Sequence, residues 1–342
     1  MKIALLRLMI CVALTGMVCC CRLCGQIFVA NGGGKVVGAY NFNGTAINAA
    51  LASDFDGAED PLGITTDGTN LYVADWGSGT AAGICKFNLF TGKLESQFGV
   101  GGYGIAIYGT NLYVAGESSV SEYTVDGTLV NFSLISFDPW EPLGVAIIGT
   151  NLYVTYGDSV GKFNLDGTAV NSELIIDPSG PIALASDGTY LYIANANNGT
   201  IGKYGLDGTT NNAALISGLL FPDGLAINGS TLYVLEATGQ LSSYTLDGAL
   251  LNSNLISSSA FSPPCYGILT VNALGVSSAA IQSNCFTFNM TGLSNQSVVV
   301  SASTGFTNWI PVETNTLGSG PFLFSDPTWT NFPSRFYRVA AQ

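Results

Sequence analysis

Short apolar runs separated by glycine-rich polar turns repeat along most of the chain. The run Leu71-Tyr72-Val73-Ala74 returns four times with small changes, and a looser copy, Ile27-Phe28-Val29-Ala30, precedes it. The aromatic residues of these runs are spaced by 39 to 44 residues and are Phe28, Tyr72, Tyr113, Tyr153, Tyr192 and Tyr233. A period of about 40 residues made of short β-type runs and turns is typical of a β-propeller, so we predict an all-β fold.

Each repeat predicts four strands, a to d from the propeller axis outward. Strand a usually opens with glycine, strand b is the Leu-Tyr-Val run, and strand c usually ends in the hairpin signal Asp-Gly. Strand a occurs six times, beginning at Gly63, Gly104, Gly144, Ala183, Gly224 and Gly267. The first repeat lacks strand a, and the last repeat consists of strand a alone. We therefore predict a six-bladed propeller over residues 26–274, in which residues 267–272 complete the blade of residues 26–60 and leave no open edge.

The repeat resembles the NHL type, a family of six-bladed secreted and signalling modules. The likeness extends over about residues 27–272, in a core of the type Gly-x-Ala followed by Leu-Tyr-Val-Ala-(Asp), and is best at Leu71–Asp75. The Asn/Arg-rich turn that usually follows this Asp in NHL repeats is missing here. The resemblance implies the six-bladed ring and leaves the subfamily open.

Residues 1–25 have the pattern of a secretory signal peptide. Lys2 and Arg7 form a basic start, residues 8–18 are apolar, and Gly25 offers a small residue for cleavage. We expect a secreted, periplasmic or cell-surface protein. Lipidation fits less well, because the residues before Cys19 match the lipidation pattern poorly. No later segment predicts a membrane span, so we expect no integral membrane segment in the mature chain.

Residues 276–342 predict a second module, a small antiparallel β-sandwich, from short alternating runs bounded by turn residues. The series from Ser303 to Arg338, with Phe324-Ser325-Asp326-Pro327 in it, resembles a C-terminal module frequent on secreted proteins of Verrucomicrobia and related bacteria. Surface attachment, sorting and capping are all compatible with that resemblance.

Charge and composition exclude several function classes. The chain has 23 acidic and 10 basic residues, and this acidic excess disfavours nucleic acid and anionic lipid as partners and favours cations. It has no histidine, which excludes a Ser-His-Asp triad and histidine metal ligands. Propeller lyases that depend on histidine are disfavoured for the same reason. In an oxidising compartment Cys265 and Cys285 could form a disulfide, and the alternative is that they remain small buried thiols.

Polar residues at the ends of the b strands predict a candidate metal site. By symmetry, Asp75, Asn195 and Glu236 surround the axis entrance, and their oxygens suit Ca²⁺ or another divalent cation. Gluconolactonase-like six-bladed enzymes hold a divalent metal on the axis with the same residue types, although no family motif aligns here. The alternative is that the three are polar turn residues which any such repeat would supply.

Aromatic residues predict a ligand-binding face at the same end of the ring. The b–c and d–a loops meet there by fold analogy, and the d–a loops also supply acids such as Glu141 and Asp223. Aromatic rings beside carboxylates suit sugar binding. The alternative is that the rings fill gaps between blades. The aromatic candidates are Trp76, Tyr103, Trp140, Tyr156 and Tyr266.

These patterns favour a secreted, non-enzymatic propeller that binds a protein or a glycan on its loop face. The alternatives are a divalent-metal-dependent hydrolase of the gluconolactonase-like type, and a purely structural cell-surface protein. The sequence requires no cofactor, and Ca²⁺ or another divalent cation is the candidate that its residue types allow.

Overall fold

The computed structural model describes residues 25–53, 55, 60–76, 83–89, 91–177, 179–271 and, further on, 275–282, 285–291, 297–304, 310–316, 322–332 and 336–341. The chain divides into two compact units, of which the larger spans Gln26–Val271 and the other includes Asn272–Gln342. The predicted signal peptide lies outside the described residues except for Gly25. No helix among the described residues is long and apolar enough to cross a bilayer.

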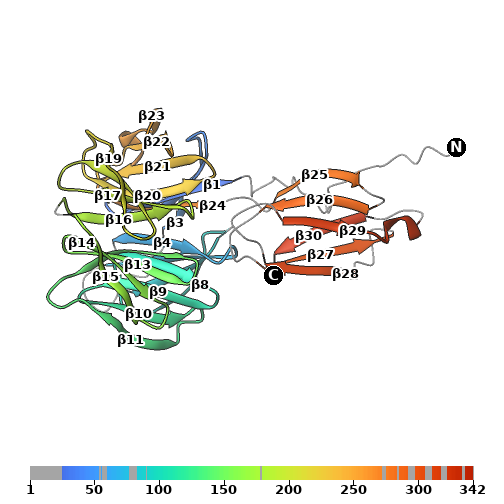
Figure 1. Ribbon diagram of the computed structural model, residues 1–342, viewed down its shortest axis with the longest axis horizontal. Helices are drawn as coiled ribbons and strands as arrows, with labels where there is room; N and C mark the ends of the chain where they lie inside the picture. Colours follow the sequence, from blue (N-terminus) through green and yellow to red (C-terminus); the bar gives the residue numbers. More distant parts are fainter. Residues whose placement is uncertain are drawn as a thin grey trace. The chain divides into compact units, whose positions relative to one another are not determined.

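The larger unit consists of six four-stranded antiparallel sheets (Figure 1), so the predicted six-bladed propeller is confirmed. Contacts between innermost strands run from each blade to the next and return to the first, which closes the ring. The blades, each given from the axis outward, are blade 1 with β24 (Cys265–Val271), β1 (Gln26–Asn31), β2 (Val36–Asn41) and β3 (Ala46–Ala52); blade 2 with β4 (Pro61–Thr66), β5 (Asn70–Asp75), β6 (Gly83–Asn88) and β7 (Leu94–Phe98); blade 3 with β8 (Gly104–Tyr108), β9 (Asn111–Gly116), β10 (Ser119–Thr124) and β11 (Leu129–Ser136); blade 4 with β12 (Pro142–Ile148), β13 (Asn151–Tyr156), β14 (Ser159–Asn164) and β15 (Ala169–Ile176); blade 5 with β16 (Pro181–Ser186), β17 (Tyr190–Asn195), β18 (Thr200–Gly205) and β19 (Thr210–Ile216); and blade 6 with β20 (Pro222–Asn228), β21 (Thr231–Glu236), β22 (Leu241–Thr245) and β23 (Leu250–Ile256), followed by the 3-10 turn η1 (Ser258–Ala260).

Blade 1 joins the two ends of the propeller sequence, as predicted. Strand β24 pairs antiparallel with β1, with Phe28 opposite Leu269 and Gln26 opposite Val271. The strand begins at Cys265, two residues before the predicted start. This pairing covers the inner edge of β1, which would otherwise be exposed at the axis.

Burial along a blade explains the repeated Leu-Tyr-Val run. The second strand packs against neighbouring blades on both faces, so it is apolar without alternation, and Tyr72, Tyr153 and Tyr192 are buried. Their hydroxyl groups need partners there. The hydroxyl of Tyr72 donates to Asp67 and that of Tyr192 donates to Asp187, and both acids stand in the turn before their strand.

The Asp-Gly pairs after the third strands are turn formers, as predicted. The carboxylate of Asp166 accepts hydrogen bonds from the backbone and hydroxyl of Thr168, and Gly167 takes a positive φ of 84°. Hydrogen bonds to Thr168 also lower the pKa of the Asp166 carboxyl. Asp207 accepts the same pair of bonds from Thr209.

The second unit contains two three-stranded antiparallel sheets. Their inward residues Phe286, Phe288, Met290, Val298, Val300 and Phe324 form one hydrophobic core. The predicted β content is therefore present, whereas the sandwich arrangement stays a prediction. The sheets are β25 (Gly275–Gln282), β26 (Cys285–Thr291) and β29 (Phe322–Asp326), and β28 (Ile310–Thr316), β27 (Ser297–Ser303) and β30 (Phe336–Ala341), with the 3-10 turn η2 (Trp329–Asn331) after β29.

Candidate functional site

The antiparallel order of each blade places the b–c and d–a loops at the same end of the ring. The contacts of blades 2 and 3 show this directly. The backbone of Trp76, in the b–c loop of blade 2, donates to Asp60 in the preceding d–a loop at 3.1 Å. The Trp76 ring also stacks on Tyr103 of the following d–a loop, with ring centroids 4.5 Å apart. The loop face is therefore assembled as the repeat predicts.

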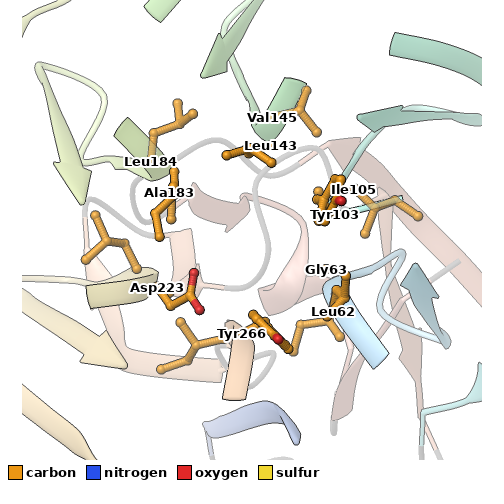
Figure 2. A pocket seen from close by; sticks show the side chains of 18 residues that line it. Leu62, Gly63, Tyr103, Ile105, Leu143, Val145, Ala183, Leu184, Asp223 and Tyr266 are labelled. Carbon is orange, nitrogen blue, oxygen red and sulfur yellow. The ribbon is translucent and has the colours of Figure 1, made fainter. Parts of the chain in front are cut away.

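A cavity of about 300 Å³ lies on the propeller axis at this end. Each blade contributes one residue from the same position, directly before the residue that opens strand a in the repeat pattern. We call this set the axial ring, and Figure 2 shows several of its members around the cavity. The axial ring consists of Leu62, Tyr103, Leu143, Ile182, Asp223 and Tyr266.

Three members of the axial ring, Asp223, Tyr103 and Tyr266, are not aliphatic, whereas the other three blades have leucine or isoleucine at this position. Asp223 lies at the cavity from β20 with Tyr266 near it, and Tyr103 lies on the other side of the cavity (Figure 2). Every other residue that lines the axial cavity is glycine or aliphatic. Burial in this apolar setting raises the pKa of the Asp223 carboxyl to about 7.

The two tyrosines are affected by the same surroundings. Burial and the nearby Asp223 and Asp60 charges raise the pKa of Tyr266. Burial and Glu141 raise the pKa of Tyr103, whose hydroxyl lies 3.5 Å from a Glu141 carboxylate oxygen. Both phenols therefore stay neutral and able to donate hydrogen bonds.

The predicted aromatic face divides into three parts. Tyr103 and Tyr266 share the axial cavity. Trp140 is 54% exposed and lies over Gly157 of its own blade, where an added Cβ would meet its ring at 2.9 Å. Tyr156 packs on Phe137, and its hydroxyl donates to the backbone oxygen of Ser172 on β15. Tyr156 therefore belongs to the packing of blade 4, and Trp140 lines neither of the two cavities described here.

Trp76 lines a second cavity, of about 270 Å³, between blades 2 and 3. We call it the Trp76 groove. Phe132 of β11 stands in its wall with 52% of its surface exposed, and the turn after β9 supplies the exposed Glu117 and Ser118. Ser121 also lines the groove and donates its hydroxyl to the Phe132 carbonyl at 2.6 Å. The groove thus combines aromatic rings, a carboxylate and hydroxyl groups.

The three predicted metal ligands stand at the ends of β5, β17 and β21, in blades 2, 5 and 6. None of them lines the axial cavity. The amide nitrogen of Asn195 donates to Asp177 at 3.0 Å inside the protein, and Glu236 accepts from the backbone of Leu220 at 2.9 Å. Asp75 is fully buried. The described residues contain no group of three or more Asp, Glu, Cys or His placed to hold a metal.

Cys265 and Cys285, the predicted disulfide partners, lie in different units of the chain and are unpaired cysteines here, and the disulfide stays a prediction. Cys265 is fully buried within the propeller, and its sulfur lies 3.7 Å from the side-chain oxygen of Asn31. Cys265 is thus a buried thiol in this structure, which was the second possibility considered for it. Cys85 is a buried thiol as well.

Sequence reasoning missed the importance of Asp223 and of Glu117. Asp223 was visible only as one of several acids in the d–a loops. Aligning the residue before each strand-a start would have singled it out, because Leu62, Leu143 and Ile182 occupy that position elsewhere. Glu117 lies in the two-residue turn between β9 and β10, and nothing in its pattern indicates that it lines a groove together with Trp76.

Comparisons with known proteins give distant structural matches and no sequence match. No family model matches the sequence, and no curated protein matches it either. A streptogramin B lyase structure is 17% identical, covers 69% of this chain and 78% of its own, and has a TM-score of 0.46. A 6-phosphogluconolactonase candidate from Bacteroides fragilis NCTC 9343 is 16% identical, covers 88% of this chain and 98% of its own, and has a TM-score of 0.48. The extracellular domain of a B. thetaiotaomicron hybrid two-component system is 14% identical, covers 78% of this chain and 35% of its own, and has a TM-score of 0.48. Similarity at this level carries no inference about activity or about the NHL subfamily.

Proposed function

We propose that the protein is a secreted binding module without catalytic activity that takes a carbohydrate ligand in the Trp76 groove. Secretion is supported by the N-terminal sequence pattern, and binding by one observation, the composition of the groove. A sugar presents an apolar C–H face and several hydroxyls at its edge. Trp76 and Phe132 offer rings for that face, and Glu117 and Ser118 offer acceptors for the hydroxyls.

A glycan array of the mature protein, followed by calorimetry on the best ligand, tests this proposal. Trp76→Ala should weaken binding by about tenfold or more, since an aromatic platform contributes on the order of 1 kcal/mol beyond its buried area. Trp140→Ala is the matched control, because that ring is exposed and lies outside the groove. Circular dichroism and melting curves of both variants report the fold.

Three results would overturn the carbohydrate proposal. Binding by Trp76→Ala at wild-type strength would show that the groove is not the site. Failure of the wild-type protein to bind any glycan would favour the alternatives, a protein partner or a purely structural role. Loss of binding in both tryptophan variants would place the ligand elsewhere on the loop face.

The metal-dependent hydrolase stays a prediction that the separate positions of Asp75, Asn195 and Glu236 do not favour. Three ligands must lie within about 2.3–2.6 Å of one Ca²⁺, and these residues already contact their own surroundings. We therefore expect calorimetric titration with Ca²⁺ to give no tight one-to-one binding that Glu236→Ala removes. Tight binding of one ion, lost in that variant, would restore the hydrolase.

A further inference from the structure

The axial cavity differs chemically from the Trp76 groove. Among the residues that the structure describes, Asp223, Tyr103 and Tyr266 are the polar side chains that line it, and the other lining residues are glycine or aliphatic. A polyhydroxylated ligand would leave most of its hydroxyls without partners there, which is unfavourable. A ligand with one charged group and an apolar body would match the lining.

The charge that such a ligand must carry follows from the surroundings of Asp223. The described residues that line the cavity include no Lys or Arg. The carboxylate is therefore partly buried without a cation beside it, which is a costly arrangement that a positively charged ligand would relieve. The titratable groups that the structure describes on the elements around Asp223 are neutral or acidic. They are Cys265 and Tyr266 on β24, Tyr233 and Glu236 on β21, Tyr190 and Tyr192 on β17, and Tyr103, Glu141 and Asp60 in the loops before β8, β12 and β4.

The two tyrosines strengthen this match. Aromatic faces attract organic cations, and the attraction is strongest where water is excluded. Tyr103 and Tyr266 line the same cavity as Asp223, with Tyr266 near the carboxylate and Tyr103 across from it (Figure 2). A cavity of about 300 Å³ has room for a ligand of roughly ten non-hydrogen atoms, taking about 30 Å³ for each.

We propose that the axial cavity binds a small organic cation, a quaternary ammonium ion or protonated amine with an apolar part, and that Asp223 is its counter-ion. This site is separate from the proposed carbohydrate groove, and either could exist without the other. The acidic balance of the chain, with a formal net charge of −13, would also raise the concentration of such cations near the protein.

The protonation of Asp223 gives the proposal a second, independent readout. Its carboxyl has a pKa raised to about 7 by burial, so in the empty cavity at neutral pH the acid is partly protonated. A cation binds the ionised form. For a ligand whose charge is fixed, affinity should therefore fall as the pH drops below about 7, approaching tenfold per pH unit.

The test compares choline with its uncharged carbon analogue, in which a tert-butyl group replaces the trimethylammonium group. Calorimetry at about pH 8 should show choline binding at least tenfold more tightly than the analogue of equal shape. In Asp223→Asn this preference should disappear, together with the pH dependence of choline affinity. Glu173→Gln is the matched control, because it removes the same charge from an exposed position of β15 outside both cavities and should change neither.

Each other outcome decides against the proposal. Equal affinity for choline and its analogue, or unchanged choline binding in Asp223→Asn, would exclude Asp223 as a counter-ion. No binding of choline or of the bulkier benzyltrimethylammonium to the wild-type protein would exclude the cation site itself. Melting curves confirm that Asp223→Asn folds, and Tyr266→Phe, which keeps the ring, should retain most of the affinity. Glycan binding by the same samples reports on the Trp76 groove separately.

Discussion

At the scale of single residues, Asp223 is informative because it breaks a repeat. A side chain that recurs in most blades is explained by the fold, as the Asp-Gly turns are. Asp223 occupies a position where three other blades have leucine or isoleucine. The fold does not need a carboxylate there, and burial makes its charged form unfavourable. The residue therefore costs stability at neutral pH, as expected for a functional residue.

This cost predicts a pH dependence of stability. The pKa of Asp223 is about 7 in the folded protein and near 3.8 when exposed, so the folded state holds the proton more tightly. The contribution of Asp223 to stability therefore falls as the pH rises from about 4 to about 7 and is constant above that range. Asp223→Asn should raise the melting temperature at about pH 8 by several degrees and change it little at about pH 4. Equal shifts at both pH values, measured by scanning calorimetry, would contradict this.

The limit of sequence reasoning at this scale is side-chain direction. The repeat correctly places Tyr103, Tyr156 and Trp76 near one end of the ring. It cannot show that Tyr156 turns outward to Ser172 while Tyr103 turns to the axis. Those choices depend on neighbours from other strands and loops, such as Ser172 of β15, and the pattern of one strand carries no information about them.

At the scale of elements, the glycine that opens strand a is explained by the closeness of neighbouring blades. A Cβ at Gly63 would lie 2.7 Å from the Tyr103 carbonyl oxygen, and one at Gly104 would lie 2.5 Å from that of Leu143. The inner strands are thus too close for a side chain at this point. The glycine at the start of strand a recurs because the neighbouring inner strands leave no space for a Cβ there.

Gly267 is the most crowded of these positions. A Cβ there would meet the Leu62 carbonyl oxygen at 2.0 Å, and backbone atoms cannot move aside easily. We expect Gly267→Ala to destabilise the propeller by about 1–3 kcal/mol, with a lower urea midpoint. Gly224→Ala is the comparison variant. Its added Cβ would lie 2.7 Å from the nearest carbonyl oxygen, so it should lower the free energy of unfolding less than Gly267→Ala does. If both variants unfold at the wild-type midpoint, the inner strands are looser than described.

Lysine side chains form a second kind of contact between blades, which the sequence pattern does not predict. Lysines on third strands reach the next blade and donate to the carbonyl of the residue before its Asp-Gly turn. Lys203 is buried, donates to the Leu246 oxygen at 3.1 Å and lies over the rings of Tyr190 and Tyr192. Lys162 makes the corresponding bond to Leu206 at 3.4 Å. Lysine in a strand usually indicates a solvent-facing position, so only the assembled ring reveals its role.

At the scale of the whole molecule, the sequence was sufficient for the architecture because the blades repeat. Six copies of strand a and six of strand b, offset by one blade, allow only the closure in which β24 joins β1. The C-terminal residues have no internal repeat, so their strands could be predicted but not their pairing. The observed order, with β29 beside β26 and β30 beside β27, joins segments far apart in the chain.

The separate cores of the two units predict separate unfolding. The propeller residues pack among themselves from blade to blade, whereas Phe288 and Phe324 belong to a core confined to the C-terminal sheets. Calorimetry of the mature chain should therefore show two transitions. Since unfolding heat scales with length, the one from residues 26–271 should carry roughly three times the heat of the other.

Phe288→Ala identifies the transitions. Phe288 is 2% exposed, and its truncation should cost about 3–5 kcal/mol, enough to lower or abolish the smaller transition. The larger transition should keep its temperature, because no propeller core residue is altered. A single transition that moves as a whole in this variant would show instead that the two units unfold as one cooperative structure.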